Sequence, residues 1–202
     1  MNLEGKNVGI ALTGSFCTFH KVFPQMERLV AEKANVYPIF SEYSQCADTR
    51  FGNADDFLKK AEEITGNKPV AAITEAEKLG PNNLLDIIAV APCTGNTLAK
   101  MANAITDSTV LMAVKGLLRN NKPIVISLST NDALSNNLKN IGMLINTKNI
   151  YFVPFGQDNY LGKPNSMVSD FSLLIPAIHE ALEGRQLQPL VLTPLLPQDN
   201  SN

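Results

Sequence analysis

The chain contains no tryptophan, only two histidines and only three cysteines among its 202 residues. Cys17, Cys46 and Cys93 form no Cys-x-x-Cys pair, and none lies at zinc-ligand spacing from His20 or His179. The acidic residues form no cluster that would replace these ligands. The sequence therefore predicts reduced thiols and no metal site.

Long apolar runs and blocks of one charge are missing as well. No run approaches the roughly 20 residues of a membrane-spanning helix, and residues 1–6 carry no basic leader with a hydrophobic signal core. We therefore expect a cytoplasmic protein without a membrane partner. The formal net charge is −2 and the lysines and arginines are scattered, which argues against nucleic acid as a partner. With 45% hydrophobic and 18% charged residues, the composition is typical of a globular domain.

Short apolar runs alternate with segments of helical periodicity, which predicts one doubly wound α/β domain with a parallel sheet. We place this domain at residues 1–183 and a C-terminal tail, either disordered or docked on a neighbour, at 184–202. Strands are expected at 8–12, 35–40, 84–91, 123–128 and 150–153, with a short extended piece at 70–73. Helices are expected at 19–30, 55–64 (ending at Gly66), 74–79, 98–105, 133–144 and 171–182 (interrupted or delayed by Pro176), and at 108–118 with Thr106 or Asp107 as cap.

The segment Ala91-Pro92-Cys93-Thr94-Gly95-Asn96-Thr97-Leu98-Ala99-Lys100 follows the buried strand at 84–91 and begins a helix. Its small residues let a ligand approach the backbone. The first N–H groups of a helix have no partner within the helix, so they attract anions. Open α/β sheets bind their ligands at this edge, beyond the carboxyl ends of the strands. The segment is therefore a candidate binding motif.

Two further strand-to-helix turns are rich in hydroxyl groups, Thr13-Gly14-Ser15 and Ser129-Thr130-Asn131, and Ser41 ends a fourth strand. Taken alone, each turn has the residues that caps and tight turns need anyway. Together they predict a site for a phosphate and a planar ring, and the absence of a G-x-G-x-x-G pattern favours FMN over NAD. The predicted cofactor-binding residues are Thr13, Gly14, Ser15, Ser41, Pro92, Cys93, Thr94, Asn96, Thr97, Ser129 and Thr130.

A carboxylate substrate requires donors beside that site. Arg50, in the polar loop at 41–51, is suited to bidentate binding of a carboxylate, and Asn96 and Asn131 complete the predicted substrate-binding set. Lys100 is either a ligand contact or a solvated helix residue. His20 could face the phosphate or a neighbouring subunit, but a partly buried cap is the favoured interpretation. Cys17 is expected to be a packing residue, and 157–169 a flap or active-site loop. Because Cys93 has no histidine as a base partner, no catalytic residue is assigned.

From Lys6 to Ala181 the chain resembles the homo-oligomeric flavin-containing Cys decarboxylases, a family that includes the flavin prenyltransferases. The resemblance is carried by Thr13-Gly14-Ser15 and by the segment 91–100 with Ala102, Ile105 and Asp107. It implies a Rossmann-like (flavodoxin-like) α/β/α fold, bound FMN, and trimers or dodecamers with the flavin at subunit interfaces.

The chain departs from this family at three places. Residues 74–79 lack the catalytic histidine of the decarboxylases, residues 127–131 lack their Pro-x-Met-Asn motif, and residues 157–169 lack their flap cysteine. Residues 9–18, 49–52 and 157–159 instead resemble a branch that forms one subunit of a two-subunit oxidoreductase acting on a small dicarboxylate. That resemblance implies NAD(P) on a dehydrogenase-like partner subunit. An independent FMN-dependent decarboxylase or prenyltransferase, and a non-catalytic scaffold subunit, remain as alternatives.

Overall fold

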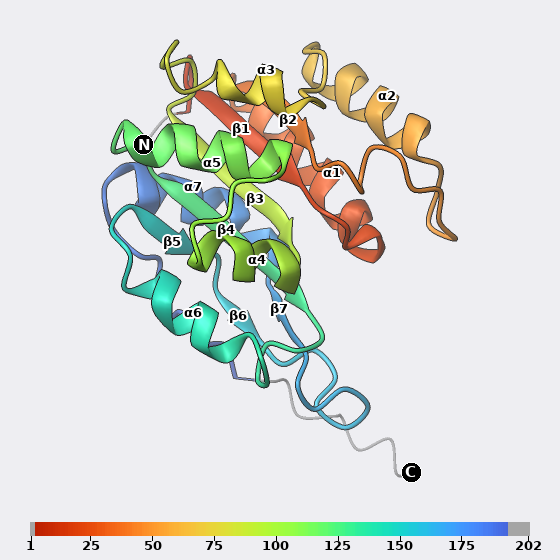
Figure 1. The fold of residues 1–202 in the computed structure, drawn as a ribbon, viewed down its shortest axis with the longest axis vertical. Helices are drawn as coiled ribbons and strands as arrows, with labels where there is room; N and C mark the ends of the chain where they lie inside the picture. The colour runs from red at the N-terminus through yellow and green to blue at the C-terminus, as the bar shows by residue number, and fades with distance from the viewer. Residues whose placement is uncertain (1–2, 194–202) are drawn as a thin grey trace.

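The computed structural model describes residues 3–193 and has one sheet with helices on both faces (Figure 1). Its five parallel strands follow the order β2-β1-β3-β4-β5, the flavodoxin-like order. The predicted doubly wound, Rossmann-like α/β/α fold is therefore confirmed. The strands are β1 (Asn7–Leu12), β2 (Asn35–Phe40), β3 (Ile87–Cys93), β4 (Ile124–Thr130) and β5 (Ile150–Phe152).

The sheet is mostly parallel, as predicted, but two short antiparallel strands that the sequence did not indicate make it a mixed sheet. β7 (Met167–Ser169) pairs antiparallel with the end of β4 and with β6 (Phe155–Gly156). The predicted flap at 157–169 therefore ends in a strand, and only residues 157–166 form a connecting loop. Strands of two or three residues are too short to show a period-2 pattern.

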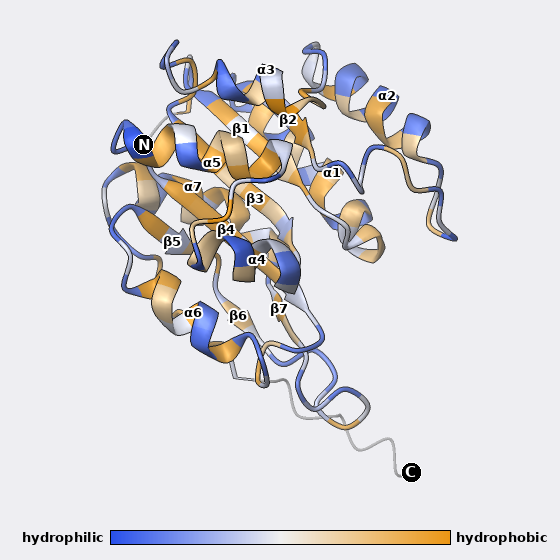
Figure 2. Ribbon diagram, viewed as in Figure 1, coloured by the Kyte–Doolittle hydropathy of each residue, from blue (hydrophilic) through white to orange (hydrophobic). Residues whose placement is uncertain are grey.

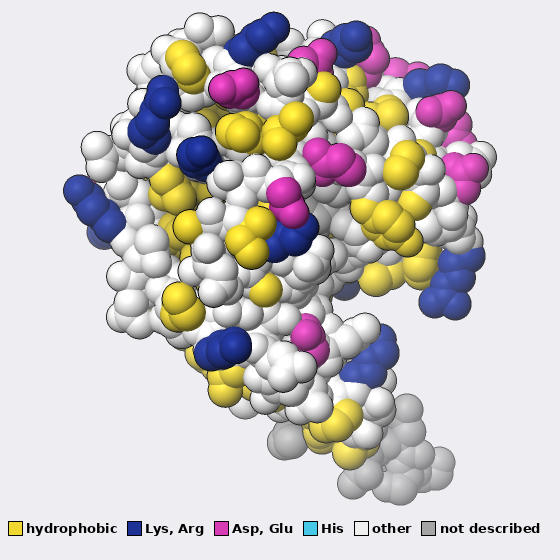
Figure 3. Space-filling model, viewed as in Figure 1, with side chains coloured by type: hydrophobic (Ala, Val, Ile, Leu, Met, Phe, Trp, Pro, Cys, Tyr) yellow, Lys and Arg dark blue, Asp and Glu magenta, His cyan; other side chains and the backbone are white. Residues whose placement is uncertain are grey.

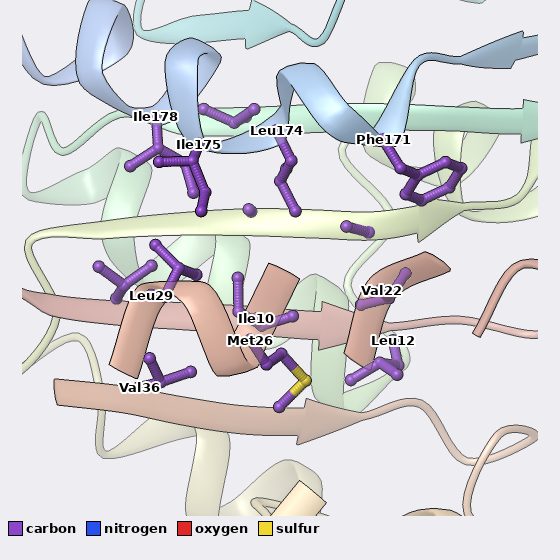
Figure 4. Packing of buried hydrophobic residues seen from close by; sticks show 14 of the residues in the cluster. Ile10, Leu12, Val22, Met26, Leu29, Val36, Phe171, Leu174, Ile175 and Ile178 are labelled. Carbon is purple, nitrogen blue, oxygen red and sulfur yellow. The ribbon is translucent and has the colours of Figure 1, made fainter. Parts of the chain in front are cut away.

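One face of the sheet is covered by α1 (Phe19–Ala31) and α7 (Leu174–Leu182). Figure 4 shows Val22, Met26 and Leu29 of α1 on the same side of β1 as Ile10 and Leu12. The strand residue between these two, Ala11, belongs to the core of the opposite face, as the alternation of a strand requires. Figure 2 shows the strands as the apolar interior.

The other face is covered by α3 (Ile73–Glu77), α4 (Gly95–Ala102), α5 (Thr109–Arg119) and α6 (Leu138–Ile145). α2 (Ala54–Thr65) packs beside α1 and ends at Gly66, whose φ of 69° confirms the predicted C-cap. Two 3-10 turns, Phe16–Thr18 and Phe171–Leu173, precede α1 and α7. Pro176 lies in the first turn of α7, where no backbone N–H is needed, so the helix begins at Leu174.

Several predicted boundaries were wrong. β3 begins at Ile87, so Leu84 lies outside it, and the strand continues through Pro92 and Cys93. α5 is capped by Ser108, whose hydroxyl accepts from the Leu111 N–H at 3.2 Å, and not by Thr106 or Asp107. α4 ends at Ala102 and α6 begins only at Leu138. Residues 70–73 contribute a single bridge, from Val70 to Ile39, before α3 begins.

Residues 185–193, the described part of the predicted tail, are hydrogen-bonded to strands of the same chain. Gln186 donates to the Phe152 carbonyl at 2.7 Å and accepts from the Phe152 N–H at 2.8 Å. The Phe155 backbone bonds to Leu190 and Leu192 at 3.0 and 2.8 Å. Residues 185–193 are therefore ordered and not a disordered end, docking of the tail on a neighbour stays a prediction, and residues 194–202 lie outside the described part. Among the described residues, no helix is long and apolar enough to cross a membrane.

Candidate functional site

Thr13 joins the turn after β1 to the motif after β3. Its side chain is only 1% exposed. The hydroxyl donates to the Pro92 carbonyl at 2.7 Å and accepts from the Thr94 N–H at 3.0 Å. These bonds link residues about eighty positions apart. They lie between β1 and β3, where the strand order reverses and doubly wound folds bind ligands.

A second bond joins the β1 turn to the turn after β4. The hydroxyl oxygens of Ser15 and Ser129 lie 2.7 Å apart and share a hydrogen bond. The structure therefore brings together the three turns that the sequence predicted to meet. Together they form one polar edge of hydroxyl and amide groups.

The beginning of α4 is braced from the turn after β4. Thr94 caps the helix, and its hydroxyl accepts from the Thr97 N–H at 3.5 Å. A Cβ on Gly95 would lie 2.6 to 2.7 Å from side-chain atoms of Thr130, Asp132 and Asn137, so only glycine fits there without a shift. Asp132 accepts hydrogen bonds from the Thr130 hydroxyl and from Asn137 Nδ2. The sequence did not mark Asp132 or Asn137 as site residues, because the brace is visible only once the strands are placed.

Several of the predicted site residues are buried or covered by other side chains. Ser41 is buried, and its hydroxyl bonds to Ser44, which in turn donates to the Leu12 carbonyl at 2.9 Å. The Cys93 side chain is fully buried in the core of the α5 face. Gly14 lies under the ring of Tyr43, which a Cβ would approach to 2.8 Å. Pro92 and Thr13 are buried as well, so the exposed and half-buried members of the predicted set that form the polar edge are Ser15, Thr94, Asn96, Ser129 and Thr130.

The two predicted cations are also engaged elsewhere. The Arg50 guanidinium lies 4.8 Å from the centre of the Phe51 ring, in the loop before α2. Lys100 donates to both carboxylate oxygens of Asp107, at 2.9 and 2.8 Å. This hydrogen bond holds the pKa of Asp107 below its ordinary value. Lys100 is thus an ion-paired residue of α4, an arrangement that neither of its two interpretations included.

A cavity of about 260 Å³ lies beside the joined turns. Ser15, Ser129, Thr130 and Asn131 line one part of it. Its other lining residues include Lys21, Asp158, Lys163 and Ser166. None of them was singled out from the sequence as a site residue, although the last three lie in the predicted flap or active-site loop at 157–169. His20 and Cys17 also line it and are exposed, which corrects their expected roles as a partly buried cap and a packing residue.

The three thiols are expected to differ sharply in reactivity. Burial raises the pKa of the Cys93 thiol to about 12, so it stays protonated at neutral and mildly alkaline pH, whereas Cys17 and Cys46 are exposed. Because the thiolate is the nucleophile, an aromatic disulfide reagent near pH 8 should modify Cys17 and Cys46 and leave Cys93 intact until the chain is denatured. Cys17→Ser and Cys46→Ser should each remove one native equivalent. A third fast equivalent in the native protein would contradict this assignment.

The donor set is chemically suited to a flavin mononucleotide. Ser15, Thr94 and Thr97 carry hydroxyls, and Asn96 is exposed at the start of α4. The Thr97 N–H is bonded to the Thr94 hydroxyl, and the Gly95 and Asn96 N–H groups that precede it have no partner within the helix. A phosphate accepts such bonds, and a flavin ring presents both donors and acceptors to an amide. Asp132, the carboxylate beside these groups, is bonded to Thr130 and Asn137.

The fold and this site define a flavoprotein. The Flavoprotein family model matches residues 1–169, and the chain belongs to that family. It is 49% identical to the B subunit of dipicolinate synthase from Bacillus subtilis (strain 168), over 95% of this chain and 96% of that protein.

Solved structures agree with this assignment. The B subunit of dipicolinate synthase from Bacillus halodurans C superposes with a TM-score of 0.89 at 49% identity, covering 96% of this chain and 100% of that one. A dodecameric FMN-dependent Ubix-like decarboxylase from Escherichia coli O157:H7 superposes with a TM-score of 0.56 at 18% identity, covering 73% and 79%. The latter likeness shows a shared fold alone.

Proposed function

We propose that this chain is the flavin-type B subunit of dipicolinate synthase. In this role it would act with the nicotinamide-dependent A subunit of dipicolinate synthase to form pyridine-2,6-dicarboxylate during sporulation, in the cytoplasm of the mother cell. The observation that carries the proposal is the 49% identity to a B subunit of dipicolinate synthase over 95% of the chain. The absence of a histidine at residues 74–79 argues against the decarboxylase alternative.

The reaction makes defined demands on the site. Converting a dihydropyridine into a pyridine removes two electrons and two protons from the ring. A bound flavin would supply a two-electron acceptor, a role that NAD(P) on the partner is equally able to fill. The protein must then hold the ring flat and hold both carboxylates. Ser15, Asn96 and Thr97 are the residues that we assign to the flavin, and Asn131 to the substrate.

The assembly proposed for this chain follows from its family. A second copy would complete the flavin site, in a trimer or a dodecamer, and the nicotinamide-dependent partner would bind to that assembly. Sedimentation of the chain alone and with the partner tests both parts. A monomer that is active with the partner would contradict the proposed homo-oligomer.

An omission assay tests the proposed function. Dipicolinate formation is followed with freshly generated precursor while this chain, the partner, FMN and the nicotinamide nucleotide are left out in turn. We expect product only when this chain and the partner are both present. Equal yield without this chain would overturn the proposal. A requirement for this chain but not for FMN would assign the redox step to the partner and leave this chain a binding subunit.

Flavin binding can be tested at one residue. Asn96 is exposed at the start of α4, so Asn96→Ala should remove an amide contact to the flavin without disturbing the core. We expect about a tenfold weaker affinity for FMN, the effect of losing one or two hydrogen bonds, measured by quenching of flavin fluorescence.

Asn103→Ala, at the far end of the same helix, is the matched control. Its affinity for FMN should equal that of the unaltered chain. Equal affinities for all three proteins would remove Asn96 from the flavin site.

A further inference from the structure

We propose that the cavity of about 260 Å³ beside the joined turns binds the two carboxylates of a small planar dicarboxylate through Lys21 and Lys163. This inference rests on the proposed function and assigns its substrate subsite. It also replaces Arg50, which does not line this cavity, as the cation that meets the substrate.

The charges of the cavity favour a dianion. Lys21 comes from α1 and Lys163 from the loop between β6 and β7, so the two cations reach the cavity from separate elements. Within residues 3–193 neither forms an ion pair, whereas Lys33 and Lys100 are paired with carboxylates. Among the described residues that line the cavity, Asp158 is the one carboxylate. Two lysines against one aspartate leave the cavity positive, which attracts an anion.

Neutral donors on the cavity wall are already oriented. The buried Ser166 hydroxyl donates to Asn131 Oδ1 at 3.4 Å, which leaves the Asn131 amide hydrogens available to a ligand oxygen. The hydrogen bond between the Ser15 and Ser129 hydroxyls uses the hydrogen of one of them, so the hydrogen of the other hydroxyl can be donated to a ligand. These groups can bind carboxylate oxygens that the lysines do not reach.

Size and apolar surface match a single small ring. Met167 and Val168 of β7 line the cavity and offer the face of a ring an apolar contact. The volume of about 260 Å³ lies below the range of about 300 to 1,000 Å³ typical of sites for larger ligands, which is too small for a whole flavin nucleotide. Ser15, Ser129 and Thr130 line this cavity and also belong to the turns that are predicted to bind the flavin. A ring bound in the cavity would therefore lie next to the cofactor.

The larger cavity nearby is a poorer candidate for a dianion. It has a volume of about 620 Å³, and Lys21 and Asp158 line it too. Lys163 does not line this larger cavity, and Asp170 adds a second carboxylate to it. One lysine against two aspartates disfavours a second negative ligand there. The surface charges of the molecule are otherwise mixed, as the face in Figure 3 shows.

Calorimetric binding of pyridine-2,6-dicarboxylate to the full chain, without partner or precursor, tests the inference. Lys21→Met and Lys163→Met keep most of each side-chain stem and remove the charge. We expect each to weaken dicarboxylate binding about five- to twentyfold, as loss of a charge-assisted hydrogen bond would. Pyridine-2-carboxylate, with one carboxylate, should bind the unaltered chain more weakly and lose affinity in only one of the two variants.

Lys148→Met, an exposed lysine before β5, and Arg50→Met are the controls, and both should bind like the unaltered chain. Any of four results would overturn the inference. The two cavity variants could keep their affinity, Lys148→Met could lose as much affinity as they do, the loss could be confined to Arg50→Met, or the unaltered chain could fail to bind. Glutarate as a second probe separates the two proposals. If it shows the lysine-dependent binding while the omission assay forms no dipicolinate, the dicarboxylate site stands and the proposed function fails.

Discussion

Thr13→Val should lower the free energy of unfolding by about 2 to 4 kcal/mol, although the two side chains have nearly the same shape. The reason is that valine would leave the Pro92 carbonyl and the Thr94 N–H without their hydrogen bonds of 2.7 and 3.0 Å to the Thr13 hydroxyl. Residue 13 is only 1% exposed, so water does not reach these groups through that position. Each polar group left unsatisfied in a buried place costs about 1 to 3 kcal/mol. Denaturant unfolding followed by circular dichroism measures the change.

Thr13→Ser is the matched control, because it keeps the hydroxyl and removes only a methyl group. We expect it to retain both bonds and most of the stability. Since Thr94 caps α4, the valine variant should also bind FMN more weakly than the serine variant does. A valine variant within about 0.5 kcal/mol of the unaltered chain, the range of ordinary surface substitutions, would show that the two turns do not depend on this hydroxyl.

Gly95→Ala should destabilise the chain by about 1 to 3 kcal/mol, the range for inserting a methyl group into a packed site. The new Cβ would lie 2.6 to 2.7 Å from atoms of Thr130, Asp132 and Asn137, which are held by hydrogen bonds to one another and cannot simply turn away. α4 must then shift, and we expect weaker FMN binding together with the lower stability. Thermal unfolding and a flavin titration measure both effects.

Gly142→Ala provides the same substitution in another helix. Nothing lies within 4 Å of a Cβ at that position in α6, so alanine should stabilise by about 0.5 to 1 kcal/mol through its helix propensity. The two alanine variants are therefore expected to change stability in opposite directions. Stabilisation by Gly95→Ala would mean that the turn after β4 does not brace α4.

The proposed roles divide the polar edge between two ligands. Asn96 and Thr97 at the start of α4 face the flavin in this scheme, and Asn131, Lys21 and Lys163 face the substrate. The departures of the sequence from the decarboxylases fall at residues 74–79, 127–131 and 157–169, not in the Pro92–Thr97 motif. The Pro92–Thr97 motif at the start of α4 is therefore the part of the site in which this chain is most like the decarboxylases.

The sequence by itself determined the layered α/β architecture and most of its elements. The apolar runs of β1, β3 and β4 are continuous because those strands are buried in the sheet, and the helices between them show clear periodicity. Hydroxyl-rich turns after three strands were visible as local composition. Knowing that parallel strands end at one edge was sufficient to predict that these turns meet.

Only the tertiary structure decided how the turns are joined and which charges reach them. Thr13 and Thr94 are 81 positions apart, and Ser15 and Ser129 are 114 apart, so no local pattern marks their bonds. Lys163 lines the cavity because the loop that carries it leads into β7, which pairs with the end of β4, and a strand of three residues has no sequence signal. Arg50 has the expected chemistry, and its guanidinium lies over the ring of the adjacent Phe51 and outside the cavity that Lys163 lines. Residue type indicates what a side chain can bind, whereas strand order and pairing determine which side chains come within reach of the ligand.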